Sequence, residues 1–378
     1  MKNNARGRLH QALARGGGMA AVIALALPLA ACSGGVGAVD EASTSSASGK
    51  YVEASSGEVH LYTWSDYFPD SLAKKFKEDT GISLSIDYFD SNETLQGKLQ
   101  ATGGAGYDVV VPSDYMVQML ADEHLLLNFD ATSLPNFKNI ETSFRKPYYD
   151  KKNAYSVPYM YGTTGFAYDS SKIDAADAPT SWKDFFNPPS SAGPIQLLAD
   201  QTDVINAALR SIGAEPCTSD PSELQAVQDL LTSFKSKVGV ISSDNIVDRL
   251  SAGEEAMGMI WNGDAHRVKE NLSSMVYVYP EEGLTRFEDN LVIPSGAKNV
   301  DQAKTFINWM LEPEHMAEAS NYTGFNSGIT GVDELLSDSM KNDPAIVPPS
   351  DYDKAEVVQT CSNDVVNKYT KIWESFKS

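Results

Sequence analysis

From residue 58 onward, the chain alternates short apolar strands with amphipathic helices. Segment 58–64 alternates apolar and polar side chains like a half-buried strand, and segment 69–81 repeats its apolar side chains with a helical period and stops at Gly81. The pattern continues with a strand, a helix and a buried strand, at 82–89, 91–101 and 107–113. This succession predicts a parallel sheet with helices on its faces.

A second series of the same kind follows later in the chain. We expect strands at 194–199, 256–261 and 275–280 and helices at 203–213, 222–237 and 301–315. The part of the chain with such patterns is about 320 residues long, which exceeds the usual size of one hydrophobic core. The sequence therefore predicts two α/β lobes.

The first 57 residues have a different composition. Residues 1–31 combine four basic residues with an apolar run that is too short to span a bilayer, which is typical of an export signal. The run ends in Leu-Ala-Ala before Cys32, which resembles the lipobox of bacterial lipoproteins, so we expect Cys32 to carry a lipid; the alternative is an ordinary cleaved signal. Residues 32–57 are rich in Gly, Ala and Ser and predict a flexible tether.

The charge and the cysteines limit the possible partners. Without the signal, the chain has 26 basic and 51 acidic residues and a formal net charge of −25. Such a chain is poorly suited to nucleic acids or anionic membranes, and it suits a cationic ligand, although a solvated acidic exterior is the simpler explanation. Cys217 and Cys361 are an even pair in an exported protein, so we expect a disulfide, with two free thiols as the alternative.

Acidic and aromatic residues follow four of the predicted strands. The segments are WSDY after the first strand, PSDY at 112–115, DQTD at 200–203 and WNGD at 261–264. Ligand groups gather at the carboxyl ends of strands in open α/β sheets. Carboxylates pair with cations, and aromatic faces attract them. We therefore expect a cleft for an elongated organic amine.

Five stretches identify a family. LYTWSDYFPDSLAKKFKEDTGISLSIDYFDSNETLQGKL, YDVVVPSDYMV, YSVPYMYGTTGFAYD, MGMIWNGDA and LVIPSGAKN together resemble the spermidine/putrescine-binding proteins of bacterial polyamine importers over about 58–378. The resemblance implies a type II periplasmic-binding-protein fold, in which two α/β lobes close on a ligand in a hinged interlobe cleft. We place the first lobe at 58–161 plus 288–333 and the second at 162–287 plus 334–378.

The resemblance also implies a set of ligand-binding residues, and two departures from it are informative. Asp66 and Asp203 stand where many relatives have Glu, so their reach is about one methylene shorter. Phe287 and Asp264 lean towards putrescine, although the rest of the chain matches the spermidine branch equally well. The implied set is Trp64, Ser65, Asp66, Tyr67, Ser113, Tyr115, Asp200, Asp203, Trp261, Asp264, Phe287, Asp289, Phe325 and Gln359.

Several of these residues have simpler explanations. Asp200 and Asp203 form D-x-x-D at a predicted helix start, where they can act as caps without any ligand. Trp64 and Trp261 can be ordinary core side chains. Asp264 can begin a turn, and acids such as Asp289 are common in solvated loops.

A serine enzyme is a less favoured alternative. Ser71 and Lys74 form S-x-x-K, and Ser243–Asn245 is S-D-N, as in penicillin-binding proteins and β-lactamases, but the third element K-T-G is absent. We find no nucleophile elbow, P-loop, H-E-x-x-H or calcium-loop motif, and therefore expect neither cofactor nor metal.

The sequence thus predicts a monomeric, lipid-anchored extracytoplasmic protein that is not an enzyme. We expect it to pass polyamines to a membrane permease driven by a cytoplasmic ATPase. A surface sensor for the same ligand is a second possibility, whereas a site for sugars or anions conflicts with the five candidate acids.

Overall fold

The structure is a computed structural model that describes residues 50–378. The predicted export signal, Cys32 and most of the tether lie outside the described residues. Among the described residues, no helix is both long enough and apolar enough to cross a bilayer.

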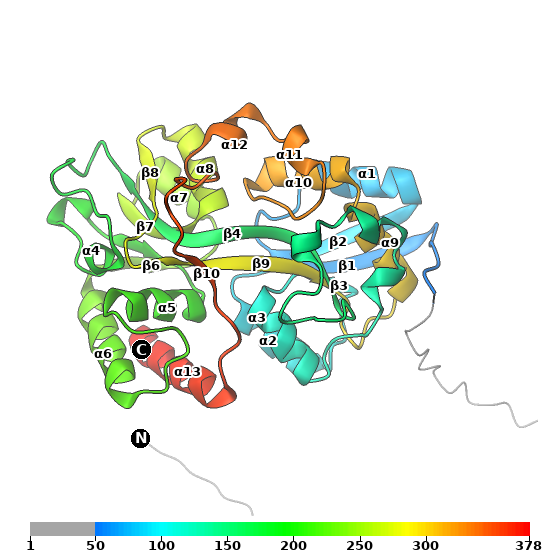
Figure 1. The fold of residues 1–378 in the computed structure, drawn as a ribbon, viewed down its shortest axis with the longest axis horizontal. Coiled ribbons are helices and arrows are strands. Elements are labelled where there is room, and N and C mark those ends of the chain that lie inside the picture. The colour runs from blue at the N-terminus through cyan, green and yellow to red at the C-terminus, as the bar shows by residue number, and fades with distance from the viewer. Residues whose placement is uncertain (1–49) are drawn as a thin grey trace, which may run out of the picture. The chain divides into compact units, whose positions relative to one another are not determined.

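One sheet runs through the described part of the chain (Figure 1). Eight of its strands pair in the order β2 (Ile82–Phe89), β1 (Gly57–Trp64), β3 (Val109–Val110), β9 (Leu284–Val292), β4 (Ser156–Asp169), β7 (Met257–Trp261), β5 (Ile195–Leu197) and β6 (Val238–Ile241). Strand β10 (Ala355–Val357) pairs with β9, and β8 (Met275–Val278) pairs with β4. Strand β1 is parallel to β2 and β3, as the alternating pattern predicted.

The described residues have two separate hydrophobic cores. The first core lies around β1–β3 with helices α1 (Asp70–Thr80), α2 (Asn92–Thr102), α3 (Asp114–Asp122), α9 (Val300–Met310), α10 (Pro313–Thr323) and α11 (Val332–Leu335). The second core lies around β5 and β7 with α4 (Trp182–Phe186), α5 (Gln201–Ser211), α6 (Pro221–Phe234), α7 (Ile246–Ala252), α8 (Asn262–Asn271) and α13 (Asn363–Lys377). Helix α12 (Asp338–Asn342) places Met340 in the first core, although it lies in the part of the chain predicted for the second lobe. The lobe boundaries stay a prediction.

Strands β4 and β9 connect the two cores, and Figure 1 shows them running side by side through the middle of the sheet. Tyr159 on β4 packs in the first core, and Phe166 on the same strand packs in the second. The pairing of β4 with β9 shifts its register between Pro158 and Met160, because proline has no N–H to donate to the ladder. These two antiparallel strands are the described elements that hold the two α/β halves together.

Local sequence signals explain most helix boundaries. Helix α1 ends at Gly81, which adopts the left-handed conformation with φ 75°. The Ser91 hydroxyl accepts a hydrogen bond from the Thr94 N–H and caps α2. The single helix predicted for 301–315 is wrong: α9 ends at Met310, and Pro313 begins α10 as its first residue, since proline fits the start of a helix but breaks its interior.

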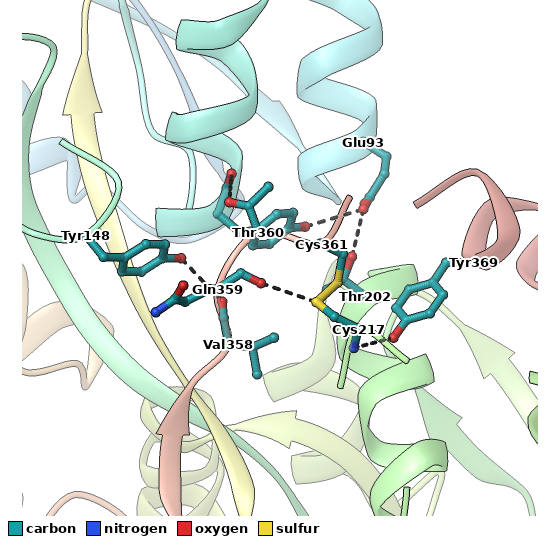
Figure 2. The surroundings of a disulfide bond; sticks show 10 residues. Glu93, Tyr148, Thr202, Cys217, Val358, Gln359, Thr360, Cys361 and Tyr369 are labelled. Atoms are coloured by element: carbon teal, nitrogen blue, oxygen red, sulfur yellow. Dashed lines mark hydrogen bonds between the residues drawn. A yellow bond between two sulfur atoms is a disulfide. The ribbon is translucent and has the colours of Figure 1, made fainter. Parts of the chain in front are cut away.

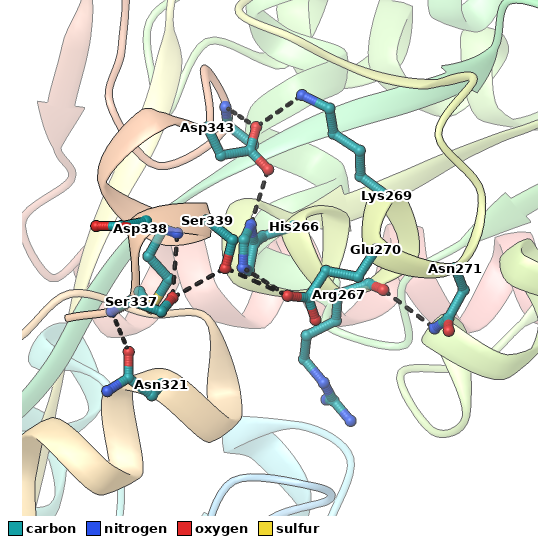
Figure 3. Close-up of polar contacts among 12 residues, drawn as sticks. His266, Arg267, Lys269, Glu270, Asn271, Asn321, Ser337, Asp338, Ser339 and Asp343 are labelled. Carbon is teal, nitrogen blue, oxygen red and sulfur yellow. Dashed lines mark hydrogen bonds and ion pairs between the residues drawn. The ribbon is translucent and has the colours of Figure 1, made fainter.

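Helix α8, which follows the pocket-lining Trp261, is anchored at its buried side (Figure 3). His266 Nδ1 lies 2.7 Å from Oδ2 of Asp343, and Lys269 Nζ lies 3.0 Å from its Oδ1. Burial of Asp343 raises its pKa, but hydrogen bonds from His266, the Ala345 N–H and Lys269 outweigh this and lower the pKa to about 2. Asp343 is therefore ionised at neutral pH and fixes α8 to the chain segment beyond α12.

A disulfide joins Cys217 to Cys361, across 144 positions of sequence (Figure 2). Cys361 lies in segment 358–361, which follows β10 and has no regular secondary structure; we call this segment the strap. The Cys217 N–H donates to the Tyr369 hydroxyl at 3.0 Å, which ties the bond to the second core. On the other side, Tyr148 donates to the Val358 carbonyl at 3.3 Å and Thr360 donates to the Tyr115 carbonyl at 3.0 Å. The strap is thus held from both halves.

Removing this disulfide is expected to destabilise the protein. A C217S/C361S double variant should lose about 2–5 kcal/mol of unfolding free energy, because the cross-link closes a long loop and restricts the unfolded chain. Chemical denaturation followed by circular dichroism measures the loss. A reductant should destabilise the wild type by a similar amount and leave the double variant unaffected; equal stability of the two proteins without reductant would contradict the expectation.

Candidate functional site

One pocket lies where the two halves meet, and all fourteen ligand-binding residues predicted from the sequence line it. They come from the ends of β1, β3, β5 and β7, from β9, and from the segments after α10 and β10: Trp64, Ser65, Asp66, Tyr67, Ser113, Tyr115, Asp200, Asp203, Trp261, Asp264, Phe287, Asp289, Phe325 and Gln359. The strand-end positions thus converge, as is usual in open α/β sheets.

The pocket lining is acidic to an unusual degree. Seven carboxylates line it, and within the described part of the chain its lining includes no Lys, Arg or His. The carboxylates are Asp66, Glu93, Asp114, Asp200, Asp203, Asp264 and Asp289. Because buried carboxylates without counter-charges are costly, this lining favours a cationic ligand.

The carboxylate of Asp289 is held by two side-chain hydroxyl groups. Its side chain is buried, and it accepts hydrogen bonds from the hydroxyls of Tyr67 and Ser113, each at 2.7 Å. Asn92 orients Ser113 by donating to its hydroxyl and accepting from its N–H, each at 3.1 Å. Burial raises the pKa of Asp289 to about 7, despite the two hydrogen bonds that act to lower it. Asp289 is therefore not a solvated loop acid.

Asp200 and Asp203 play different local roles. Asp200 caps α5 by accepting from the Asp203 N–H at 3.0 Å, so the capping role holds for this residue while it also lines the pocket. Asp203 does not cap; its carboxylate accepts from Trp261 Nε1 and from Thr164 Oγ1, each at 3.0 Å. Burial and the nearby charge of Asp200 raise the pKa of Asp203 to about 8.

Asp66 and Asp264 share a cation that lies behind the pocket lining. Arg267 on α8 places Nη2 3.5 Å from Asp66 Oδ2 and Nη1 3.5 Å from Asp264 Oδ1. Burial raises the pKa of Asp264 to about 6, and Arg267 partly opposes this rise. The side chain of Asp66 is half exposed, so this ion pair lies towards solvent.

Direct contacts join the two walls of the pocket. The rings of Trp64 and Trp261 meet edge to face with centroids 5.5 Å apart. Ser65 donates to Asp244, and Thr202 Oγ1 donates to Glu93 Oε1 at 3.1 Å. The walls therefore touch in this structure. Trp64 lines the pocket and is also a buried member of the first core, whereas Trp261 packs against both cores.

The strap forms one edge of the pocket. Val358, Gln359 and Cys361 are lining residues, and Figure 2 shows the strap between Tyr148 on one side and the disulfide on the other. The sequence predicts a ligand-binding role for Gln359 and, separately, a disulfide for Cys361. The structure shows that the disulfide and the predicted ligand residue lie on the same short segment.

Two acids of the pocket are not in the predicted ligand-binding set. Glu93 lies in the first turn of α2, and Asp114 is the first residue of α3. An acid in the first turn of a helix usually interacts with the helix dipole, so Glu93 does not stand out in the sequence. Asp114 is the acid of the PSDY segment that follows a strand end, but the resemblance implied only its neighbours Ser113 and Tyr115 as ligand residues.

The alternative chemistries lack an assembled site. Ser71 and Lys74 are exposed on α1, with Ser71 donating to Glu318, whereas Ser243 and Asn245 line the pocket. The two motifs of the enzyme hypothesis therefore do not come together. Among residues 50–378, no group of three or more His, Cys, Asp or Glu side chains is arranged to hold a metal ion.

Comparison with known proteins agrees with this geometry. A family model described as bacterial extracellular solute-binding protein matches residues 71–348. A spermidine/putrescine-binding periplasmic protein from Haemophilus influenzae is 33% identical over 330 residues, covering 87% of this chain and 91% of the relative. A putrescine-binding periplasmic protein from Pseudomonas aeruginosa is 33% identical over 313 residues, covering 78% and 85%.

A solved structure leads to the same family. A spermidine/putrescine ABC transporter protein from Listeria monocytogenes superposes with a TM-score of 0.79 at 31% identity, covering 85% of this chain and 98% of that one. The predicted α/β fold of the periplasmic binding proteins is thereby confirmed. The chain belongs to the bacterial extracellular solute-binding proteins.

Proposed function

We propose that this chain captures polyamines, which are linear aliphatic amines with two or more positive charges, and delivers them to the permease of an ABC transporter. The observation that carries the proposal is a pocket lined by seven carboxylates and by no basic side chain among the described residues. The names of the relatives, which bind spermidine and putrescine or belong to an ABC transporter, support the same ligand class.

The aromatic lining matches the other half of such a ligand. Trp64, Trp261, Phe287 and Phe325 lie among the acids in the pocket. Methylene groups gain free energy from burial against apolar walls, at about 0.8 kcal/mol for each buried CH₂. Aromatic faces also attract ammonium groups directly. A metal ion would use the carboxylates but not the rings, so the combination favours an organic amine.

The proposal extends to location and partners. An export signal at 1–31 and a lipid on Cys32 would keep the protein outside the cytoplasm and tethered to the membrane through 32–57. It would act as a monomer and catalyse no reaction, and ATP hydrolysis would belong to the transporter. Metabolic labelling with a labelled lipid precursor tests the anchor, because the C32S variant should incorporate no lipid.

Calorimetry tests the ligand class. In low-salt buffer, where ion pairs are little screened, putrescine and spermidine should give a measurable heat of binding. The uncharged analogue 1,4-butanediol should give none. Asp289→Asn should weaken binding by about tenfold or more, since it removes a buried charge-assisted contact. Asp122→Asn, which removes the same charge from the exposed side of α3, is the matched control. Absence of binding by every amine would overturn the proposal.

The raised pKa values predict how pH affects the empty protein. The pKa values of Asp203, Asp289 and Asp264 are raised to about 8, 7 and 6, so the folded protein holds more protons than the unfolded chain between about pH 4 and 8. For such groups the free energy of unfolding falls as pH rises through this window. Asp203→Asn removes one of them and should raise the melting temperature of the empty protein.

The gain should be larger at pH 8 than at pH 5, because Asp203 is charged only towards the upper end of the window. Thermal unfolding at both pH values, without ligand, measures it. Asn keeps the local contacts, since its oxygen can accept from Trp261 and its NH₂ can donate to Thr164. An equal gain at both pH values would show that charge is not the cause.

A further inference from the structure

Two carboxylates of the pocket have an oxygen that no described residue satisfies. Asp114 is buried, with 3% of its surface exposed; its Oδ1 accepts from the Tyr115 N–H at 2.8 Å, and its Oδ2 is buried without a hydrogen-bond partner. Glu93 Oε1 accepts from the hydroxyls of Thr202 and Tyr115, at 3.1 and 3.3 Å, while its Oε2 is likewise buried and unpaired. Both acids therefore flank Tyr115 with one oxygen bonded and one free.

Ordinary structural roles account for only half of each side chain. Asp114 sits in the first turn of α3 and Glu93 in the first turn of α2, where the helix dipole favours an acid. Each also has a bonded oxygen that fixes its rotamer. Folded proteins leave few buried polar atoms unpaired, because such an atom loses its hydration without gaining a hydrogen bond. The second oxygen of each acid thus calls for a donor from outside the chain.

The surroundings indicate what kind of donor would fit. Burial raises the pKa of both acids; the charge of Asp200 raises that of Glu93 further, and the charges of Glu288, Asp289 and Asp203 raise that of Asp114. Apolar side chains of Phe89, Met116 and Met119 lie in the same pocket, and the strap borders it with Val358 and Gln359. A positive group on an aliphatic chain would satisfy both the oxygens and these walls.

This region differs from the part of the pocket near Asp66. There, Arg267 already supplies a cation to Asp66 and Asp264. Asp289 interacts with both regions. It accepts a hydrogen bond from Tyr67, and the charge of Asp264 contributes to the raised pKa of that tyrosine. In addition to burial, the charge of Asp200 raises the pKa of Asp289 itself. Around Glu93 and Asp114, the hydrogen-bond partners of the carboxylates are neutral hydroxyl and N–H groups.

We infer that Glu93 and Asp114 form a further cation subsite beside the strap, which binds the third ammonium of a linear triamine. The inference rests on the proposed function and narrows its substrate class from polyamines in general to those with three or more charges. A diamine has no ammonium left for the two free oxygens once its two charges pair with Asp203 and Asp289. A triamine such as spermidine carries the third positive charge, and all four acids line the same pocket.

Calorimetry with one diamine and one triamine tests the subsite. The wild type should bind spermidine about tenfold or more tightly than putrescine. Glu93→Gln and Asp114→Asn should each weaken spermidine binding by about tenfold and putrescine binding by less than about threefold. Glu78→Gln on the exposed side of α1 and Asp122→Asn on α3 are the matched controls and should change neither affinity.

A ligand variant gives the same test without altering the protein. N-acetylspermidines keep most of the chain but have lost one terminal charge, and the isomer acetylated at the end beside Glu93 should bind the wild type no more tightly than putrescine. The inference is overturned if putrescine binds as tightly as spermidine, if both substitutions weaken the two amines equally, or if neither acetylated isomer loses affinity. Failure of both amines to bind would instead reject the proposed function itself.

Discussion

The burial of several like charges in one pocket is the constraint on which the rest of this structure depends. Carboxylates near one another in a region of low dielectric repel, and each also loses hydration. The fold meets this cost by giving each deep acid at least one strong donor: Tyr67 and Ser113 for Asp289, and Trp261 for Asp203. Tyr67 and Ser113 lie in the first half, and Trp261 lies in the second half with its acceptor Asp203. Across the pocket walls, Thr202 donates to Glu93, so this contact both satisfies an acid and joins the walls.

The strands that connect the two cores pass close to the pocket. Strand β4 passes from one core to the other, and Gly162 lies on it next to the pocket aromatics. A Cβ at this position would come within 2.8 Å of Phe287 Cζ and 2.9 Å of Phe325 Cδ1, which is closer than side chains tolerate, and it would also clash with Asn262 Oδ1. Glycine is therefore needed here for space, and it lets the backbone of β4 approach the aromatic lining closely.

How far the sequence predicts this structure depends on the range of the interactions. The first elements of the chain, from β1 to α3, were predictable because periodicity, Gly81 and Ser91 are local signals. Strand β4 was not predicted as a strand, since Pro158, Gly162 and Gly165 are turn-forming residues. It is extended because β9 and β7 pair with it on either side, and both are more than 80 residues away.

The same distinction applies to the site. Acids after strand ends could be found from the sequence, because topology places all carboxyl ends of parallel strands at one edge. Glu93 could not, because its burial is produced by a group that is remote in sequence, and Asp114 was found only as the acid of PSDY, outside the ligand set that the resemblance implied. Glu93 is covered by Thr202 across the pocket, and the strap that the disulfide holds at Cys217 covers the region near Tyr115. Family resemblance did not point to them either.

Selectivity for cations in this pocket does not require that all seven acids be charged when it is empty. The raised pKa values mean that several of them carry a proton near neutral pH when the pocket is empty. A cation that enters therefore displaces protons rather than meeting a fixed negative charge. The net gain is the difference between an ammonium–carboxylate contact and a protonated carboxyl, and it is largest where an ammonium reaches two acids at once. A neutral ligand makes no ammonium–carboxylate contact and does not displace these protons. The partly protonated pocket therefore selects ligands by their charge as well as by their shape.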